Sequence, residues 1–268
     1  MTDAAIATRT RDSIAPALAT FLVLGCALSW YPWVLHLMGR PGNGGPNPLG
    51  LLLAALIAAA VDLGWRGSAG VLRRMVRLKA PSRVWLTALL LPFAALAVGV
   101  AAGSAAGVSI RFAPPHWSDL FDRLVFALLF VALGEEPAWR GFLLPLLQRR
   151  FAPVAATLLL SAVWAVWHLP LMGGEFAWDV VPFFLLSLVG AAFVLSWMFN
   201  ASNSTLPGMA MHALLNTASA GYVFTLVARA DLERFWLIYG GVWLAAGILT
   251  IASTRGRLGA CRPPATEP

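Results

Sequence analysis

The chain has 268 residues, of which 59% are hydrophobic and 12% carry a charge. Soluble globular domains carry about 25% charged residues, so this composition excludes that class and indicates a protein that crosses a membrane several times. The formal net charge of +7 is not evidence for nucleic-acid binding, because the basic residues stand in short clusters between apolar runs rather than along one face. We therefore expect the lipid bilayer as a partner and no nucleic acid.

Apolar runs long enough to cross a membrane follow one another along the sequence. A membrane-spanning helix needs about 20 mostly apolar residues. We predict an all-α, polytopic membrane bundle of about eight transmembrane helices that forms a single membrane domain over residues 1–268. The predicted spans are residues 17–37, 48–65, 84–106, 119–147, 152–171, 178–199, 205–227 and 234–253.

The first three predicted spans have a distinctive start and two distinctive connectors. Arg9 and Arg11 precede the first span as in a signal peptide, but the run is long enough to span and lacks a small-residue cleavage site, so we predict an uncleaved helix. Residues 39–48 are rich in Gly, Pro and Asn and are predicted to form a loop. Residues 66–83 are strongly basic and are compatible with a short amphipathic helix at the membrane interface.

The basic residues also predict the orientation of the chain. Cytoplasmic loops of membrane proteins are enriched in Lys and Arg. If the chain starts in the cytoplasm and alternates, 13 basic residues fall on the cytoplasmic side and 5 on the other, so we predict that both termini are cytoplasmic. The first set is Arg9, Arg11, Arg66, Arg73, Arg74, Arg77, Lys79, Arg83, Arg149, Arg150, Arg255, Arg257 and Arg262, and the second is Arg40, Arg111, Arg123, Arg229 and Arg234.

The fourth predicted span is unusually long. At 1.5 Å per residue, residues 119–147 would extend about 43 Å as a straight helix, which exceeds a hydrocarbon core of about 30 Å. Pro137 removes a backbone donor and disfavours helical geometry at Glu136, and Pro145 repeats the effect. We therefore predict a bend near Glu136, with the freed backbone groups satisfied by protein or by water in a cavity.

The same span carries the densest polar motif of the chain, because residues 134–141 read GEEPAWRG. Ionisable groups at membrane depth are costly and are therefore functional candidates. Glu136 and Arg140 have the i, i+4 spacing of a helical ion pair. Glu135 points about 100° away from Glu136, and two adjacent carboxylates disfavour double ionisation, so one of them is a candidate acid or base. The alternative is a structural charge cluster that holds a bent helix.

Two histidines and an asparagine in later spans are candidate partners. His168 and His212 each lie in a long apolar segment, and Asn216 follows His212 by four residues, on the same helical face. Side chains of both kinds can donate hydrogen bonds to the charge that develops on a carbonyl under attack. The same pair would also suit substrate binding in a transporter. Taken alone, each histidine is compatible with an ordinary hydrogen-bonded intramembrane histidine.

Known catalytic motifs narrow the possible chemistry. The sequence contains no HExxH, G-x-S-x-G, P-loop or CxxC pattern, so a serine or cysteine nucleophile has no recognisable setting. Glu135 and His168 can supply a general base that deprotonates water. A zinc site is an open alternative, because Glu135, His168 and His212 provide three ligands and leave a position for water. We therefore expect either no cofactor or zinc.

Three motifs in this order resemble those of the CAAX prenyl protease and bacteriocin-processing superfamily (CPBP, or Abi) of intramembrane proteases. The superfamily has EExxxR, FxxxH and HxxxN motifs. The resemblance covers about residues 119–220, which form the motif-bearing core. In this chain the motifs read Glu135-Glu136 with Arg140, Trp164 with His168, where Trp replaces the usual Phe, and His212 with Asn216.

The resemblance implies an intramembrane endopeptidase that hydrolyses a peptide bond of a membrane-associated or lipidated protein or peptide. Members have been described both as metalloproteases and as metal-independent glutamate proteases, and the resemblance favours the second. Their substrates are prenylated CAAX proteins in eukaryotes and peptide precursors or pheromones in bacteria, where immunity functions also occur. The chain is short and has no eukaryotic targeting feature, so we expect a bacterial, multi-pass protein of the inner membrane. The implied roles are water activation by Glu135 and His168, an oxyanion hole of His212 and Asn216, and support by Glu136, Arg140 and Trp164.

Two other functions are compatible with these residues. A noncatalytic membrane scaffold or bacteriocin-immunity protein would bind a peptide without cleaving it. A proton-coupled transporter would use Glu135 and His168 as a relay. A relay needs titratable groups from one face of the membrane to the other, whereas the outer half of the spans offers almost none besides Asp122 and Arg123. We therefore predict the peptidase.

Overall fold

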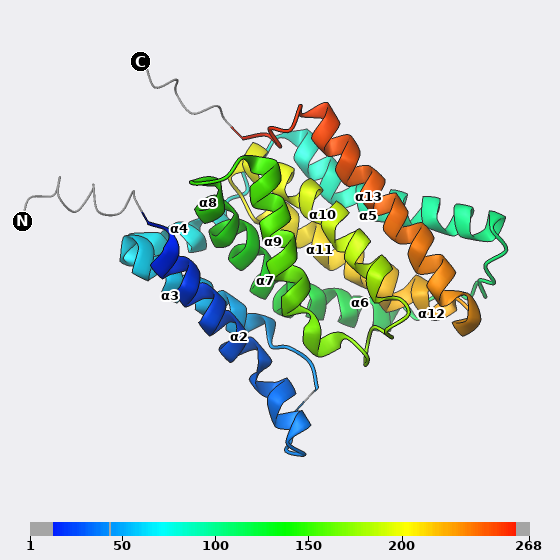
Figure 1. Cartoon of the computed structure of the whole chain (residues 1–268). Helices are drawn as coiled ribbons and strands as arrows, with labels where there is room; N and C mark the ends of the chain where they lie inside the picture. The colour runs from blue at the N-terminus through cyan, green and yellow to red at the C-terminus, as the bar shows by residue number, and fades with distance from the viewer. Residues whose placement is uncertain (1–12, 43, 261–268) are drawn as a thin grey trace, which may run out of the picture.

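The structure is a computed structural model that describes residues 13–42 and 44–260. Within this part the chain folds into a bundle of helices (Figure 1), and its β-type pairs are the isolated bridges Ile110–Val227 and Met172–Phe176. The predicted all-α class is confirmed. The first helices are α2 (Ala15–Leu37), α3 (Pro48–Leu63), α4 (Trp65–Met75) and α5 (Ser82–Ala105). The next are α6 (Trp117–Phe126), η1 (Ala127–Ala132), α7 (Leu133–Ala138), η2 (Trp139–Leu143) and α8 (Leu144–Gln148). The remainder are α9 (Pro153–Trp167), η3 (Leu169–Leu171), α10 (Val181–Ser202), α11 (Leu206–Ala218), η4 (Ser219–Val223), α12 (Phe224–Leu226), η5 (Arg229–Asp231) and α13 (Leu232–Ser253).

The helices coincide with the predicted spans to within a few residues at most ends. Among the described residues, α2, α5, α10 and the helix over 229–253 are each long and apolar enough to cross a membrane. The apolar helices α3 and α9 are shorter. The predicted spans 119–147 and 205–227 are composite, because each joins α-helical and π-helical segments. Membrane-length apolar helices in this number confirm a helical membrane bundle.

The connector 66–83 contains the short helix that its composition suggested. Helix α4 covers most of its first half, and Gly64, at φ 65°, separates it from α3. A left-handed φ favours glycine, which explains why the chain can turn sharply at this point. A Cβ on Gly67 would lie 2.1 Å from the carbonyl oxygen of Ala59, so α4 folds closely back onto α3. The last turn of α4 carries Arg73 and Arg74.

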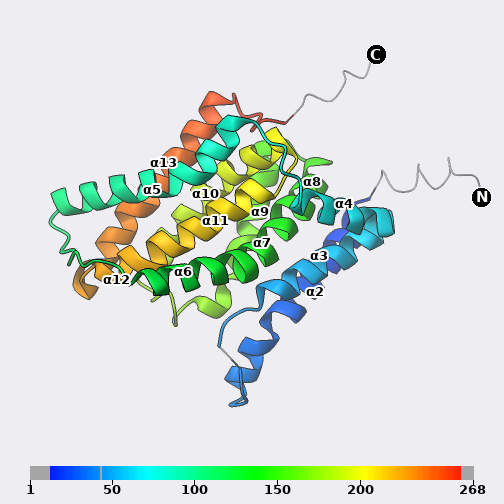
Figure 2. The same ribbon diagram turned by 180° about the vertical axis from the view of Figure 1, so that it is seen from behind.

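Close helix contacts depend on small residues. Helix α3 packs against α2 and α7, α10 packs against α13, and α5 packs against α11 and α13. A Cβ on Gly134 of α7 would lie 2.4 Å from the carbonyl oxygen of Pro48, and one on Gly190 of α10 would lie 2.1 Å from that of Trp243. Small residues allow such approach between membrane helices. Figures 1 and 2 show the α2–α3 hairpin on one flank of the bundle and α5 with α13 on the other.

One end of the bundle gathers most of the basic residues. We call it the basic end and define it as residues 62–83, 149–152, 200–206 and 254–260. Hydrogen bonds tie its segments together, since Arg74 Nε donates to Asn203 Oδ1 at 3.2 Å and Asn200 Nδ2 donates to the carbonyl oxygen of Leu258 at 3.0 Å. Its basic residues are Arg66, Arg73, Arg74, Arg77, Lys79, Arg83, Arg149, Arg150, Arg255 and Arg257, and its one acidic residue in this range is Asp62.

The other end, which we call the loop end, consists of residues 38–42, 44–48, 106–123, 168–180 and 219–234. Backbone pairs join its connectors, with the amide of Arg111 donating to the carbonyl of Leu226 and that of Ala228 donating to Ser109, both at 2.9 Å. Its charges are balanced in sign. They are Arg40, Arg111, Arg123, Arg229 and Arg234 against Asp119, Asp122, Glu175, Asp179, Asp231 and Glu233.

Candidate active site

The two adjacent glutamates lie on a helical turn with irregular neighbours on both sides. Helix α7 carries Glu135, Glu136 and Pro137, and π-helical segments η1 and η2 precede and follow it. The sequence predicted a bend at this proline. Helical turns continue through Pro137, because π turns, which take up an extra residue, accommodate a position that has no N–H to donate. Such π segments frequently occur at functional sites.

Glu135 is buried, yet one of its carboxylate oxygens has no hydrogen-bond partner among the described residues. Both indole N–H groups nearby donate to the same atom: Trp164 Nε1 lies 2.8 Å from Glu135 Oε2, and Trp139 Nε1 lies 3.2 Å from it. The side chain also lines a cavity. The contacts within the described residues thus hold Oε2 and leave Oε1 open toward the cavity.

Glu136 lies behind this surface in a sealed ionic cluster. Its Oε1 accepts hydrogen bonds from Arg140 Nη1 and His212 Nδ1, both at 2.9 Å. Glu136 and Arg140 are 0% and 1% exposed, and neither lines the cavity. The helical ion pair expected from the i, i+4 spacing is therefore present. A Cβ on Gly208 would lie 3.1 Å from Glu136 Oε2, so α11 approaches the cluster closely at this glycine.

Trp164 connects the parts of the site. Its indole lies under the Arg140 guanidinium, whose Cζ is 4.3 Å from the ring centroid, a cation–π distance. The ring centroids of His168 and His212 lie 5.8 Å and 5.9 Å from that of Trp164. Trp164, the aromatic residue of the second motif, therefore does more than line the cavity. The Trp164 N–H holds Glu135, and a phenylalanine has no such donor.

His168 is oriented by its own helix. It is the C-cap residue directly after α9, and its Nδ1 lies 2.8 Å from the carbonyl oxygen of Trp164. A carbonyl oxygen can only accept, so Nδ1 carries the proton that it donates. In the neutral ring Nε2 is then unprotonated and can act as a base or an acceptor. His168 is 9% exposed and lines the same cavity as Glu135.

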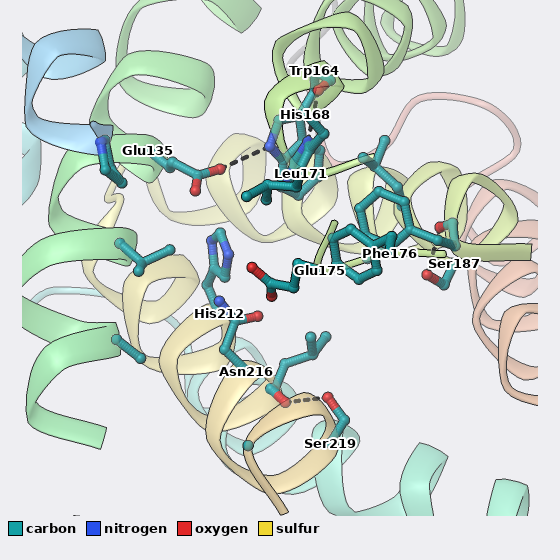
Figure 3. A pocket seen from close by; sticks show the side chains of 18 of the residues that line it. Glu135, Trp164, His168, Leu171, Glu175, Phe176, Ser187, His212, Asn216 and Ser219 are labelled. Carbon is teal, nitrogen blue, oxygen red and sulfur yellow. Dashed lines mark hydrogen bonds between the residues drawn. The ribbon is translucent and has the colours of Figure 1, made fainter. Parts of the chain in front are cut away.

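A cavity of about 460 Å³ joins these groups. Figure 3 shows Glu135, His168, His212 and Asn216 around one space, contributed by α7, the end of α9 and α11. All four were candidate residues from the sequence, and the structure brings them together. Rings of Phe176, Phe184, Trp236 and Tyr239 line the cavity further along.

Two charged residues at the cavity were not singled out as site residues from the sequence. Glu175, on the α9–α10 connector, points into the space beside His212 (Figure 3), and burial raises the pKa of its carboxyl. Arg123 of α6 reaches the same cavity and packs against Gly221. Within the described part of the chain neither has a hydrogen bond or an ion pair. Their place depends on tertiary packing, so no local pattern in the sequence could have identified them.

The zinc alternative is not supported by the disposition of the ligands. Among residues 13–42 and 44–260, no group of three His, Cys, Asp or Glu side chains is placed to hold a metal ion. Glu135 Oε1 and the Nε2 atoms of His168 and His212 have no hydrogen-bond partner among the described residues, but the three side chains of the expected set do not come together as a ligand group. The residues present therefore do not fit a three-ligand zinc centre in this conformation.

Sequence comparisons cover the segment that builds this site. Residues 117–218 match the family described as type II CAAX prenyl endopeptidase Rce1-like. The curated protein CAAX prenyl protease 2 of Methanococcus maripaludis is 28% identical to this chain over 110 residues. That match covers 37% of this chain and 41% of the relative, so the similarity spans less than half of either protein. The family segment contains Glu135, His168, His212 and Asn216.

Proposed function

With residues 117–218 belonging to the Rce1-like CAAX endopeptidases of the CPBP superfamily, we propose that this protein is an intramembrane endopeptidase. Its substrate is a membrane-associated or lipidated protein or peptide, and its nucleophile is an activated water. The observation that carries this proposal is the convergence of Glu135, His168, His212 and Asn216, from three separate segments, on one cavity.

Glu135 and His168 activate the water in this proposal. Glu135 Oε1 has no donor among the described residues, and Glu135 lines the cavity, while the two indoles fix the other oxygen and hence the direction of the carboxylate. His168 offers an unprotonated Nε2 to the same space. A proton passes from water to this pair, and the water oxygen forms a bond to the carbonyl carbon of the substrate.

His212 and Asn216 stabilise the oxygen that becomes negative. Asn216 supplies an amide N–H₂, and His212 donates from Nε2 when the ring is imidazolium, with Nδ1–H directed at Glu136. Both side chains line the cavity. When the tetrahedral intermediate collapses, the C–N bond breaks and the departing amine takes the proton held by the Glu135–His168 pair. The products are a new carboxylate and a new amine, and no step runs through a metal.

The proposed location is a bacterial inner membrane with both termini in the cytoplasm. The apolar helices place the chain in a membrane as a multi-pass protein. The orientation is supported by the charges of the two ends, because the basic end, where α2 begins and α13 ends, has ten basic residues and one acidic residue. Arg9, Arg11 and Arg262 of the predicted cytoplasmic set lie outside the described residues.

The proposed activity is tested by measuring cleavage of a fluorogenic peptide library by the purified full chain in proteoliposomes. Glu135→Gln and His168→Ala are expected to lower kcat by about 10²–10⁴-fold, the usual contribution of a positioned acid or base. Glu233→Gln, on an exposed turn of α13, is the matched control and is expected to keep the parent's rate. Unchanged rates in both site variants would remove the assignment.

A further inference from the structure

One wall of the cavity comes from α13, a helix that carries none of the proposed catalytic groups. We call it the α13 wall and define it as Trp236, Tyr239 and Trp243, which line the cavity from positions i, i+3 and i+7. Residues at this spacing share one helical face. All three lie outside residues 117–218, the segment that matches the Rce1-like family. The α13 wall is therefore a part of the cavity that the family match does not describe.

Aromatic contacts connect the α13 wall with the proposed catalytic groups. The ring centroid of His168 lies 5.1 Å from that of Phe184, which lies 5.9 Å from that of Trp236. The Trp236 ring lies 6.1 Å from Tyr239, and the Tyr239 ring lies 6.4 Å from Trp243. The cavity volume of about 460 Å³ is in the range of ligand pockets and far exceeds the ~30 Å³ that one water occupies. Besides the attacking water, the cavity therefore has room for a stretch of substrate along the α13 wall.

Two polar groups of the α13 wall are buried without a hydrogen-bond partner. Tyr239 and Trp243 are 2% and 1% exposed, and neither the Tyr239 hydroxyl nor Trp243 Nε1 has a partner among the described residues. Ser219 is a polar neighbour of Tyr239, but its hydroxyl donates to the carbonyl oxygen of Leu215. Buried polar groups in native proteins are nearly always paired, because an unpaired one costs free energy. Since both residues line the cavity, a molecule bound there can supply the missing partner.

The chemistry of the two groups indicates what this partner is. An indole N–H only donates, and a phenol hydroxyl donates as well as accepts, so together they suit an acceptor oxygen. The cavity-lining residues of α10 and α13 carry no charge, so an anionic oxygen would be buried there without a counter-ion, whereas a neutral carbonyl oxygen would not need one. A peptide backbone presents such an oxygen at every residue. A hydrocarbon chain presents none.

We propose that Tyr239 and Trp243 form a substrate-binding subsite that donates hydrogen bonds to a backbone carbonyl of the peptide near the scissile bond. Phe184 and Trp236 pack against the uncharged side chain that accompanies this carbonyl. The proposal rests on the proposed peptidase function and assigns two residues that bind its substrate. A lipid chain in the same place would leave both donors unpaired, and water alone would pair them without contributing to substrate binding.

The subsite is tested first by binding of a fluorescein-labelled pentapeptide with three central leucines. The full chain with Glu135→Gln is used in detergent micelles, and fluorescence anisotropy is corrected for empty micelles. Adding Tyr239→Phe or Trp243→Phe is expected to raise Kd by about 2–10-fold, the effect of losing one hydrogen bond. Tyr31→Phe and Trp197→Phe are the matched controls, because they remove the same groups on α2 and α10 outside the cavity lining, and they are expected to leave Kd unchanged.

A second peptide separates backbone recognition from hydrophobic binding. In this analogue E-alkenes replace the amides that join the leucines, so the shape is kept and those carbonyls are absent. Its Kd is expected to be the same with and without Tyr239→Phe. Equal weakening of both peptides would indicate altered packing and overturn the proposal. An unchanged Kd of the amide peptide in Tyr239→Phe would mean that water alone pairs the hydroxyl, and absence of saturable peptide binding would also overturn the proposal.

The third readout is kinetic and uses Tyr239→Phe in the otherwise unchanged chain. In the proteoliposome assay KM is expected to rise by about 2–10-fold while kcat stays near the parent value, because the lost bond holds the ground state and the transition state equally. The free energy of unfolding without peptide should not fall, since the hydroxyl has no protein partner to lose. A fall would assign it a structural partner instead. Peptide binding without cleavage by the parent would remove the proposed function alone, whereas cleavage with unchanged KM and Kd in Tyr239→Phe would remove the subsite alone.

Discussion

Glu135 and Glu136 are neighbours in the sequence but belong to two different regions of the molecule. Glu135 lines the cavity and accepts two indole N–H groups on one oxygen. Glu136 lies behind the wall and binds Arg140 and His212. A helix turn separates the two side chains by about 100°, which is enough to place one in a reaction space and the other in a sealed ion cluster.

The contrast shows how a single motif can supply both chemistry and the framework that holds it. A carboxylate that must take a proton needs an open oxygen and no fixed cation, which describes Glu135. A carboxylate that holds two cationic or potentially cationic groups in place must itself stay ionised, which describes Glu136. Each of the following changes acts first on one side of this division.

The largest expected effect is a loss of stability in Glu136→Gln. This change leaves the Arg140 guanidinium buried without its counter-ion, and breaking a buried pair in this way costs about 3–5 kcal/mol. The free energy of unfolding is measured by SDS titration in mixed micelles, followed by tryptophan fluorescence.

Glu135→Gln is the matched control for that change. Its amide oxygen can still accept the indole N–H groups of Trp139 and Trp164, so we expect a change within about 1 kcal/mol, because the net worth of an ordinary hydrogen bond is of that size. Equal losses in the two variants would contradict the division between a framework glutamate and a reaction glutamate.

On the cavity side, Asn216→Ala is expected to lower kcat by about 10²–10³-fold, the usual effect of removing one oxyanion donor. Substrate binding in the ground state should change little, so KM stays near the parent value. Asn200→Ala is a suitable control, because its amide donates to Leu258 at the basic end and lies outside the cavity. If Asn216→Ala raises KM alone, Asn216 binds substrate rather than the developing charge.

A smaller effect is expected from Trp164→Phe, which replaces the tryptophan with the residue usual in the superfamily motif. The change keeps an aromatic ring beside Arg140 but removes the N–H bond to Glu135, and hydrogen bonds to charged groups are worth about 1.5–3 kcal/mol. We expect kcat to fall by about 10–100-fold and the pH profile of kcat/KM to move, because the carboxylate loses a donor that favours its charged form.

Trp167→Phe is the matched control for this positioning role. Trp167 also lines the cavity, but its indole nitrogen is buried without a hydrogen-bond partner in the described structure. Trp167→Phe should therefore leave the pH profile of kcat/KM unchanged. The same shift in both variants would indicate altered packing instead of a lost donor to Glu135.

The sequence predicts the course of the helices well because long apolar runs leave few alternatives in a bilayer. The bounds of α2, α5 and α13 fall within a few residues of the predicted spans. What the sequence does not predict near Pro137 is the change in hydrogen-bond pattern on both sides of α7. The π turns of η1 and η2 extend the helix through this region, and neither has a distinct hydrophobic pattern in the sequence.

Some contacts of the candidate site can likewise be predicted from the sequence, and others depend on tertiary packing. The motif spacing predicts the Glu136–Arg140 pair directly, since its partners are one helical turn apart. The bond from Trp164 to Glu135 joins residues on two different helices, so only the packing of α9 against its neighbours establishes it. The proximity of Glu175 to the cavity depends likewise on the fold of the α9–α10 connector, where the amide of Gly173 donates to the carbonyl of Phe176 at 2.7 Å.

The smallest expected effect is that of removing metal ions. Because Glu135, His168 and His212 do not form a three-ligand group among the described residues, peptidase activity is expected to persist within about twofold after dialysis against a chelator. Metal content of the purified chain, measured by elemental analysis beside activity, provides the check. Loss of activity on chelation, with recovery on adding Zn²⁺ in proportion to bound metal, would require the two histidines and Glu135 to rearrange into a ligand set. In that case the division between Glu135 and Glu136 would become one between a metal ligand and its supporting ion cluster.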